Sequence, residues 1–236
     1  MNEQTRGGVG GTDALAAEVL SGLRAFPESA ELVLGGYFAL RRYADYRATH
    51  DLDAWWKTGR TEPTMTRVRE VMQDVAVRHG LTLVERAWGE TVSFELAAAE
   101  RKVFSFQIAL RSLELEPPEP SQWQPILIES LADNVGSKMN ALVQRGAARD
   151  FLDIREVVIR GVASVAQCWD WWARKNPGMD VRQARAQALR HIQALEQRRP
   201  LDSIVDGGER EAARRTREWI RLVLLQVPDD AGDDDT

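Results

Sequence analysis

The stretch "ELVLGGYFALRRYADYRATHDLDAWW", residues 31–56, is the part of the sequence that decides the fold. An apolar run ends at Gly35 and Gly36, and Asp51 and Asp53 follow with one residue between them. Side chains at i and i+2 of a strand point to the same side, so the two carboxylates are expected to project together. Two parallel carboxylates repel unless a cation lies between them, and Mg²⁺ prefers such oxygen ligands, completed by water and substrate phosphates. The stretch therefore predicts a divalent-metal pair, with Mg²⁺ or Mn²⁺ as the cofactor.

The Gly pair predicts a phosphate-binding turn. The apolar run at 31–34 reads as a strand, 37–46 as a helix and 50–56 as the next strand. A Gly pair between strand and helix exposes backbone N–H groups at a helix N-terminus, where phosphate oxygens bind well. Arg47 is a candidate to neutralise a phosphate or the carboxylates, and a solvated helix-end cation is its alternative. A phosphate-binding turn next to a metal pair is suited to moving a nucleotidyl group.

Other segments complete a small mixed sheet with helices. Helical spacing of apolar residues predicts helices at 12–25 and 63–79. Period-two alternation predicts a hairpin of two strands, 91–97 and 102–110. The proline-rich segment 115–122 reads as irregular, because proline fixes φ and lacks a backbone donor.

The chain after the proline-rich segment reads as helical throughout. The pattern predicts helices at roughly 124–145, 150–173, 180–198 and 209–226. We therefore expect an α+β protein in which a sheet-containing domain is followed by a helical domain. The predicted divisions are a disordered leader (1–11), a sheet-containing core (12–115), a C-terminal helical domain (121–228) and an acidic disordered tail (229–236).

Composition narrows the class of protein. The chain has 236 residues, is 44% hydrophobic and contains no apolar run long enough to span a bilayer. The polar, Gly-rich N-terminus has no secretory apolar region. Cys168 is the single cysteine, which excludes an internal disulfide and a cysteine-based metal cluster, and a cytoplasmic location is expected.

Charge is distributed unevenly along the chain. Residues 138–228 contain 17 Lys and Arg against 11 Asp and Glu. Such an Arg-rich half attracts phosphate-rich partners, of which RNA is one. Its alternative is a set of solvated helices with no nucleic-acid partner.

Two motifs carry a resemblance to a known family. "LVLGGYFALRRYADYRATHDLD" resembles the first motif of nucleotidyltransferases of the DNA polymerase β type, and is more closely similar to the AbiEii/AbiGii toxin family. That family shows an apolar strand, Gly-Gly-Ser/Thr, a helix, then Arg-x-Ser/Thr-x-Asp-x-Asp. A second match is "DNVGSKMNALVQRGAARDFLDI", residues 133–154, which resembles the family's Lys, Arg and Arg-Asp-x-x-Asp pattern. Together the matches and the hairpin cover about residues 31–160.

The second motif also has a physical interpretation of its own. Lys138 and Arg145 are two helical turns apart and face one side, and the compact ammonium of a lysine suits the β/γ-phosphates of an NTP. Asp150 and Asp153 lie three residues apart on a helix. They can orient Lys138, hold a second metal, or pair with Arg145 and Arg149. The resemblance favours catalytic roles for Lys138 and Asp150 and leaves the role of Asp153 open.

The sequence departs from the family pattern at two places. Tyr37 stands where the family has Ser or Thr, so its hydroxyl is further from the backbone than the family's phosphate contact. The third carboxylate of the polymerase β class is expected on the strand at 102–110, where Ser105 or Gln107 stands instead. Glu95 on the partner strand is the nearby carboxylate with the right alternation, and its alternative is an exposed strand residue. Without a third carboxylate we expect weaker activation of an acceptor hydroxyl.

The resemblance implies a Mg²⁺-dependent nucleotidyltransferase that acts as an AbiEii-type toxin of a toxin–antitoxin or abortive-infection system. It implies an NTP substrate, an RNA or tRNA acceptor and an antitoxin protein encoded nearby. Two alternatives stay open: a catalytically degenerate nucleotidyltransferase-fold binding module, and a nucleotidyltransferase that modifies a small-molecule hydroxyl. By residue, the resemblance implies Asp51 and Asp53 as metal ligands and, listed with them, Gly35, Gly36, Tyr37, Arg47 and Lys138 for the nucleotide and Asp150 for catalysis.

Overall fold

The computed structural model describes residues 9–111 and 113–226. Residues 1–8 of the expected leader and the expected tail at 229–236 lie outside the described residues, whereas residues 9–11 form the start of a helix. The chain divides into two compact units after Asn134, inside a helix. The division therefore differs from the expected junction between residues 115 and 121, because the proline-rich segment joins the sheet of the first unit.

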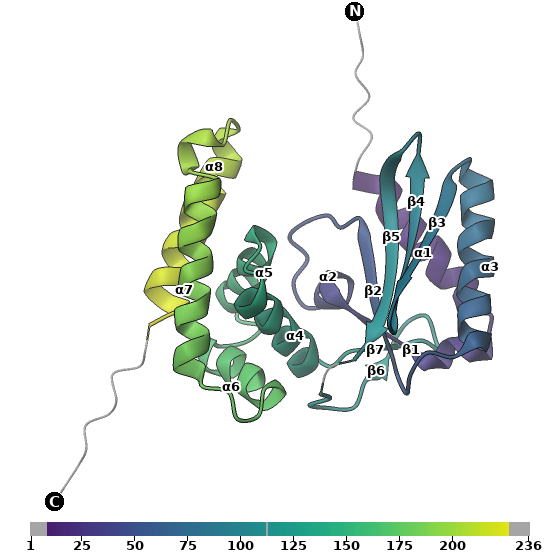
Figure 1. Cartoon of the computed structure of the whole chain (residues 1–236), viewed down its shortest axis with the longest axis horizontal. Helices are drawn as coiled ribbons and strands as arrows, with labels where there is room; N and C mark the ends of the chain where they lie inside the picture. Colours follow the sequence, from purple (N-terminus) through teal and green to yellow (C-terminus); the bar gives the residue numbers. More distant parts are fainter. Residues whose placement is uncertain (1–8, 112, 227–236) are drawn as a thin grey trace, which may run out of the picture. The chain divides into compact units, whose positions relative to one another are not determined.

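The first unit is built on one mixed sheet of seven strands in the order β3-β4-β5-β2-β1-β7-β6 (Figure 1). β2 runs antiparallel to β1 and parallel to β5, and β1 runs parallel to β7. The strand bounds are β1 (Leu32–Gly35), β2 (Asp51–Trp56), β3 (Thr82–Trp88), β4 (Thr91–Ala98), β5 (Arg101–Leu110), β6 (Glu119–Pro120) and β7 (Leu127–Ile128).

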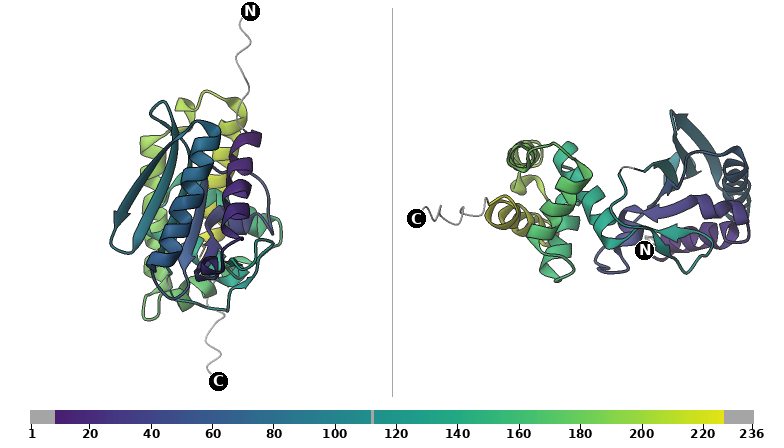
Figure 2. Two further views of the ribbon diagram at one scale, coloured as in Figure 1. Left: turned by 90° about the vertical axis from the view of Figure 1, so that its right-hand side faces the viewer. Right: turned by 90° about the horizontal axis from the view of Figure 1, so that it is seen from below.

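Helices α1 (Val9–Leu23) and α3 (Glu62–His79) lie side by side and cover one face of this sheet (Figures 1 and 2). The alternating apolar residues of the strands point to that face, because burying them removes apolar area from water. Among them, Leu52, Phe94 and Phe106 are fully buried in one hydrophobic core with the helices. The polar residues of the same strands, Asp51 and Asp53 included, therefore lie on the opposite face.

The predicted hairpin is confirmed as β4 and β5, with Phe94 opposite Phe106. β3 was not predicted, because it is an edge strand with mostly exposed side chains and shows no alternation of apolar and polar residues. The expectation of irregular structure at 115–122 is wrong at β6, since an edge strand tolerates proline. A short 3₁₀ helix, Pro27–Glu31, precedes β1.

The predicted helix at 37–46 is much shorter in the structure. α2 spans Gly36–Leu40, and the chain then turns back toward β2. The hydroxyl of Tyr37 accepts hydrogen bonds from the backbone N–H groups of Tyr46 and Arg47, both at 2.9 Å. A side chain thus satisfies the donors that a longer helix would have paired with carbonyl groups.

The second unit is helical, as predicted, but its helices are more finely divided. The predicted helix at 150–173 is two helices, because Gly161 adopts φ +69° and Ser164 begins a new helix with a capping box to Gln167. The predicted helix at 124–145 begins only after β7. The bounds are α4 (Leu131–Gln144), α5 (Ala148–Ile159), α6 (Val165–Lys175), α7 (Val181–Arg198), the 3₁₀ turn Leu201–Ser203, α8 (Gly207–Trp219) and the π-helical turn Ile220–Leu224.

Aromatic and aliphatic side chains from these helices form the core of the second unit. Trp169 and Trp172 pack edge to face with ring centroids 6.0 Å apart, and the indole N–H of Trp169 donates to the carbonyl of Leu224. Burial raises the pKa of the Cys168 thiol beside them to about 12. In the part of the chain that the structure describes, no helix is both long and apolar enough to cross a membrane.

Candidate active site

The two aspartates of the first motif project from one side of β2. Leu52 and Ala54 are buried in the core, so the alternating Asp51 and Asp53 point away from it. The side chain of Asp51 is 32% exposed. Because the carboxylates are anchored on a central strand, their spacing is fixed by the pleat of the sheet rather than by a loop.

Asp53 lies directly against the glycine turn. Gly35 and Asp53 are partners in the β1–β2 ladder. Gly36 has φ +60°, which favours glycine, and a Cβ there would lie 2.1 Å from Oδ2 of Asp53. Gly36 is therefore required twice, by the backbone conformation and by the approach of the carboxylate. The turn and the metal-ligand candidate form one compact group, as the sequence predicted.

A buried polar group on the other side of the turn was missed by sequence reasoning. Glu129 follows β7 and is 1% exposed, and a Cβ on Gly35 would lie 2.8 Å from its Oε2. Asn134 donates to Oε2 of Glu129 at 2.9 Å and to the carbonyl of Gly36 at 3.0 Å. These two residues hold the carbonyl side of the turn and leave its N–H side to other partners. The available signal was an acidic residue ending the apolar run "ILIE" at 126–129, which the expected helix at 124–145 concealed.

Asp51 shares one carboxylate oxygen between two donors. The hydroxyl of Ser105 donates to Oδ1 of Asp51 at 2.6 Å, and Nζ of Lys102 lies 3.2 Å from the same atom. Lys102 also donates to the hydroxyl of Ser105 at 3.2 Å. Lys102 was not identified from the sequence, because it lies 51 residues away from Asp51. Only the parallel pairing of β2 with β5 brings them together.

The expected position of a third carboxylate can now be located. Ser105 is the partner of Asp51, and Gln107 is the partner of Asp53, in the β2–β5 ladder. Glu95 is opposite Ser105 on the next strand, and its carboxylate lies 3.5 Å from the guanidinium of Arg86. Two strands therefore separate Glu95 from Asp51, and Glu95 has a cationic neighbour of its own.

The donor set suits magnesium better than a metal held by protein alone. Among the described residues, no group of three or more His, Cys, Asp or Glu is arranged to hold a metal ion. Mg²⁺ is commonly bound by one or two carboxylates together with water and substrate phosphates. Asp51 and Asp53 offer two such carboxylates on one face of β2, so they fit an ion that arrives with a nucleotide.

Tyr37 and Arg47 form a stacked pair beside the turn. Tyr37 is 2% exposed, and the Arg47 guanidinium lies 3.8 Å from the centre of its ring. Besides accepting the two loop N–H groups, the Tyr37 hydroxyl is 3.2 Å from Oδ1 of Asp45. Burial raises the pKa of Tyr37, so this hydroxyl stays protonated. The expectation that Tyr37 contacts a nucleotide is not supported by this geometry: the side chain is occupied in holding the loop that carries Arg47.

Lys138, the cation of the second motif, is bound by Asp153. Its Nζ lies 2.8 Å from Oδ2 of Asp153, with side-chain exposures of 12% and 0%. Lys138 comes from α4 and Asp153 from α5, so one helix fixes the ammonium presented by the other. Of the three roles considered for the aspartates, orienting Lys138 is the one that Asp153 performs.

Asp150 has a different set of partners. Its two carboxylate oxygens each accept from the Arg145 guanidinium at 2.9 Å, and Oδ2 also accepts from the backbone N–H of Ala147 at 3.2 Å. Asp150 is fully buried in the first turn of α5. The predicted catalytic residue is therefore seen in a structural arrangement that caps α5 and holds the α4–α5 turn, and it does not bind Lys138 in this structure.

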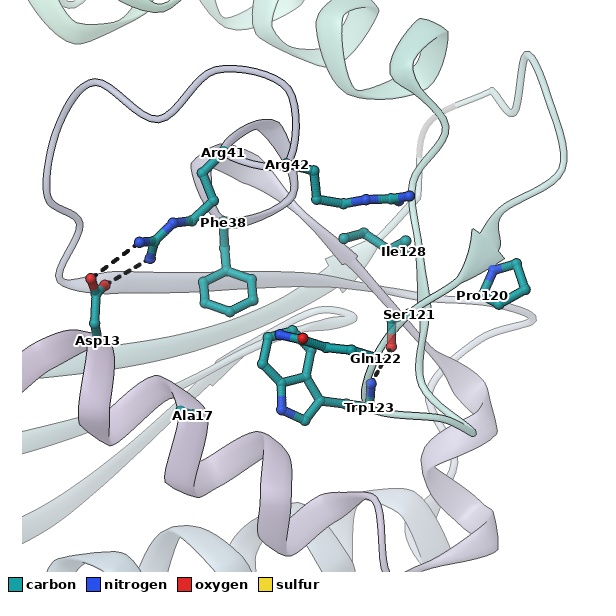
Figure 3. A pocket seen from close by; sticks show the side chains of 10 residues that line it. All are labelled: Asp13, Ala17, Phe38, Arg41, Arg42, Pro120, Ser121, Gln122, Trp123 and Ile128. Atoms are coloured by element: carbon teal, nitrogen blue, oxygen red, sulfur yellow. Dashed lines mark hydrogen bonds and ion pairs between the residues drawn. The ribbon is translucent and has the colours of Figure 1, made fainter.

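A separate cavity of about 480 Å³ lies beside α2 in the first unit (Figure 3). The rings of Phe38 and Trp123 form part of its wall, with centroids 5.3 Å apart. Arg41 at its rim is bound by both carboxylate oxygens of Asp13, at 2.9 and 3.2 Å. The walls come from α1, α2 and the segment before β7 rather than from β2, so this cavity is distinct from the aspartate pair.

Comparison with known proteins agrees with the fold and the motifs. Residues 18–216 match the family model described as "Nucleotidyl transferase AbiEii toxin, Type IV TA system". Among solved structures, a "putative nucleotidyltransferase from H. pylori" superposes with a TM-score of 0.52 at 16% identity, over 90% of this chain and 93% of that one. No curated protein matches the chain.

The fold and the site thus define a protein of the nucleotidyltransferase class. Because the family model spans most of the chain, the protein belongs to the AbiEii nucleotidyltransferase family of type IV toxin–antitoxin systems. The resemblance seen in the two sequence motifs and the expected α+β fold are both confirmed.

Proposed function

We propose that this protein transfers the nucleoside monophosphate of an NTP to a hydroxyl group of an RNA, such as a tRNA, in a Mg²⁺-dependent reaction. We further propose that it acts as a toxin controlled by an antitoxin encoded nearby. The observation that carries the proposal is the contact of Asp53 with the glycine turn, beside Asp51 on the same face of β2. Metal ligands and a phosphate-binding turn are then adjacent, which nucleotidyl transfer requires.

The reaction follows from the groups on this face. An acceptor oxygen attacks the α-phosphorus, the bond to the bridging oxygen breaks, pyrophosphate leaves and the acceptor proton is released. Mg²⁺, when bound, neutralises the phosphate charge and polarises the α-phosphate. Asp51 and Asp53 would hold it, the N–H groups of Gly35 and Gly36 would bind phosphate oxygens, and Arg47 would add positive charge.

Lys138 is the candidate phosphate ligand of the second unit. Asp153 fixes its ammonium while part of the side chain remains exposed. A compact, oriented ammonium is well suited to the β/γ-phosphates. Ser105 donates a hydrogen bond to Asp51 at the position where the polymerase β class has a carboxylate, so we expect slow activation of the acceptor hydroxyl.

The test is binding and transfer in wild type and in Asp53→Asn. Asparagine keeps the shape that packs against Gly36 but removes the charge. Calorimetry with each NTP and Mg²⁺, and transfer of labelled nucleotide to total RNA, are expected to fall by at least about 100-fold, because a metal supplies several kcal/mol. Glu90→Gln, which neutralises an exposed residue of the β3–β4 turn, is the matched control and is expected to behave as wild type. Equal NTP affinity in Asp53→Asn and wild type would remove the metal site from the proposal.

A degenerate binding module is the second candidate, and one observation favours it. The ammonium of Lys102 already lies 3.2 Å from Asp51, where it competes with a metal ion. This alternative predicts NTP binding without release of pyrophosphate in the presence of total RNA. Transfer to a small-molecule hydroxyl instead of RNA would favour the remaining alternative from the sequence.

A further inference from the structure

We propose that the solvent-facing side of α7 is a docking surface for the sugar–phosphate backbone of a base-paired RNA stem. The inference rests on the proposed function in so far as the acceptor is an RNA, and it names the surface and the form of RNA that this surface fits. It is argued within the second unit alone.

The exposed side of α7 is basic and polar. The helix contains four arginines and a single acidic residue, Glu196, which is partly buried and paired with Arg221. Within α7, which the structure describes throughout, no carboxylate is exposed. Its exposed residues are Arg182, Gln183, Ala186, Leu189, Arg190, Gln193, Gln197 and Arg198.

Two of these arginines bind only weakly competing, neutral acceptors in the contacts seen. Nε of Arg190 donates to the amide oxygen of Gln187 at 2.9 Å, and Nε of Arg198 donates to the carbonyl of Ala194 at 3.3 Å. A neutral acceptor leaves the full positive charge of a guanidinium to attract an anion. The opposite side of α7 is anchored by Ala184, Ala188 and Ile192, so the helix presents its charged side from a fixed position.

The neighbouring helix α8 shows what a self-neutralised arginine surface looks like. Nη2 of Arg214 lies 2.7 Å from Glu211 and Nη1 lies 3.1 Å from Glu218, and Arg215 also reaches Glu211 at 3.6 Å. The Arg214 guanidinium lowers the pKa of the Glu211 carboxyl, as expected for a charged pair. Both helices are rich in arginine, but only α7 leaves its arginines without carboxylates on the same face.

The chemistry of this face fits a base-paired RNA. Guanidinium groups bind phosphates, and the amides of Gln183, Gln193 and Gln197 donate to phosphate oxygens and accept from 2′-hydroxyls. Double-stranded RNA is recognised by such phosphate and 2′-hydroxyl contacts. Single strands are usually bound by stacking on aromatic side chains, and α7 contains no Phe, Tyr or Trp. Arg190 and Arg198 are eight residues apart, about 12 Å along the axis, which spans several phosphates.

The experiment compares two double variants of the full chain. Arg190→Gln/Arg198→Gln removes two charges from α7, and Arg214→Gln/Arg215→Gln removes two from α8. Binding of a fluorescein-labelled RNA hairpin is measured by anisotropy at several salt concentrations. The α7 variant is expected to bind at least about 10-fold more weakly, with the salt slope of log K reduced by about 1 to 2. The α8 variant is expected to stay within about twofold of wild type. Equal losses in the two variants, or no loss in the α7 variant, would overturn the proposal.

Further arms separate this inference from its neighbours. A single-stranded RNA of equal length should bind more weakly than the hairpin, and equal or tighter binding would refute the preference for a stem. If the α7 variant bound RNA normally but was no longer inhibited by the antitoxin, α7 would be a protein interface and the proposal would be wrong. If wild type bound the hairpin through α7 but transferred no nucleotide, the proposed reaction would fail while the docking surface stood. If transfer to RNA persisted and the α7 variant bound normally, the docking surface alone would fail.

Discussion

The carboxylates of the two units are held in opposite ways. On β2 the Asp51 side chain is 32% exposed and shares one oxygen between a hydroxyl and an ammonium. On α5 Asp150 and Asp153 are fully buried, and each binds a guanidinium or ammonium from α4 or the turn after it. Exposed carboxylates on a rigid strand remain able to exchange partners. Buried carboxylates lose their hydration and therefore depend on the cation beside them.

This difference assigns ligand binding to the first set and positioning to the second. A metal ion or a nucleotide can replace Lys102 at Asp51, because the ammonium returns to water at little cost. Nothing comparable is available to Asp153, since removing Lys138 would strand a carboxylate that is 0% exposed. The predictions below test this division, starting with the largest expected effect.

Lys138→Ala is expected to lower the free energy of unfolding by about 3–5 kcal/mol, because it removes the cation from a buried carboxylate. The motif alone predicted a solvent-exposed lysine whose loss would not affect stability. Denaturant unfolding measures the effect, and transfer per folded molecule should fall at least 10-fold, since a charged phosphate contact contributes about 1.5–3 kcal/mol.

The control for Lys138 is the double variant Lys138→Gln/Asp153→Asn. It replaces the ion pair by two amides of similar size, so most of the stability should return while transfer stays low. Full stability in Lys138→Ala would mean that the Asp153 carboxylate does not depend on Lys138. Recovery of transfer in the double variant would show that Lys138 acts on stability alone.

Asp150→Asn is expected to cost about 1–3 kcal/mol of stability, because it weakens the bidentate pair with Arg145 and the cap of α5. Transfer per folded molecule should stay within about twofold of wild type, which thermal unfolding together with an activity assay would establish. Arg145→Gln removes the other partner and should reproduce the loss. A large fall in transfer at unchanged stability would restore Asp150 to the catalytic set and break the division between the two units.

Lys102→Met is expected to have the smallest effect, and in the favourable direction. The pair with Asp51 is half-exposed, so stability should change by less than about 0.5 kcal/mol. Binding of Mn²⁺ in the absence of nucleotide, followed by electron paramagnetic resonance, should strengthen by about 2- to 5-fold, because one competing positive charge is gone. Arg101→Met removes the same charge from the adjacent residue of β5, on the other face, and should change Mn²⁺ binding less. Weaker Mn²⁺ binding in Lys102→Met would show that Lys102 supports the site instead of competing for it.

Several features of this protein were determined by the sequence alone, because they depend on neighbouring residues. The alternation of a strand places Asp51 and Asp53 on one side of β2, and the Gly pair adopts the turn that only glycine at position 36 permits. The hairpin of β4 and β5 follows from its own period-two pattern. Helix ends at Gly161 and Ser164 were also readable locally, although a continuous helix was predicted there.

Contacts between distant segments were decided by the tertiary structure. Lys102 meets Asp51 only because β2 pairs in parallel with β5, and Glu129 reaches the turn only because β7 pairs with β1. Lys138 is bound by Asp153 rather than Asp150 because of how α4 and α5 pack, which the i,i+3 spacing of the two aspartates does not reveal. Sequence periodicity fixes the side of an element on which a residue lies, whereas its partner depends on strand order and helix packing, which no local pattern contains.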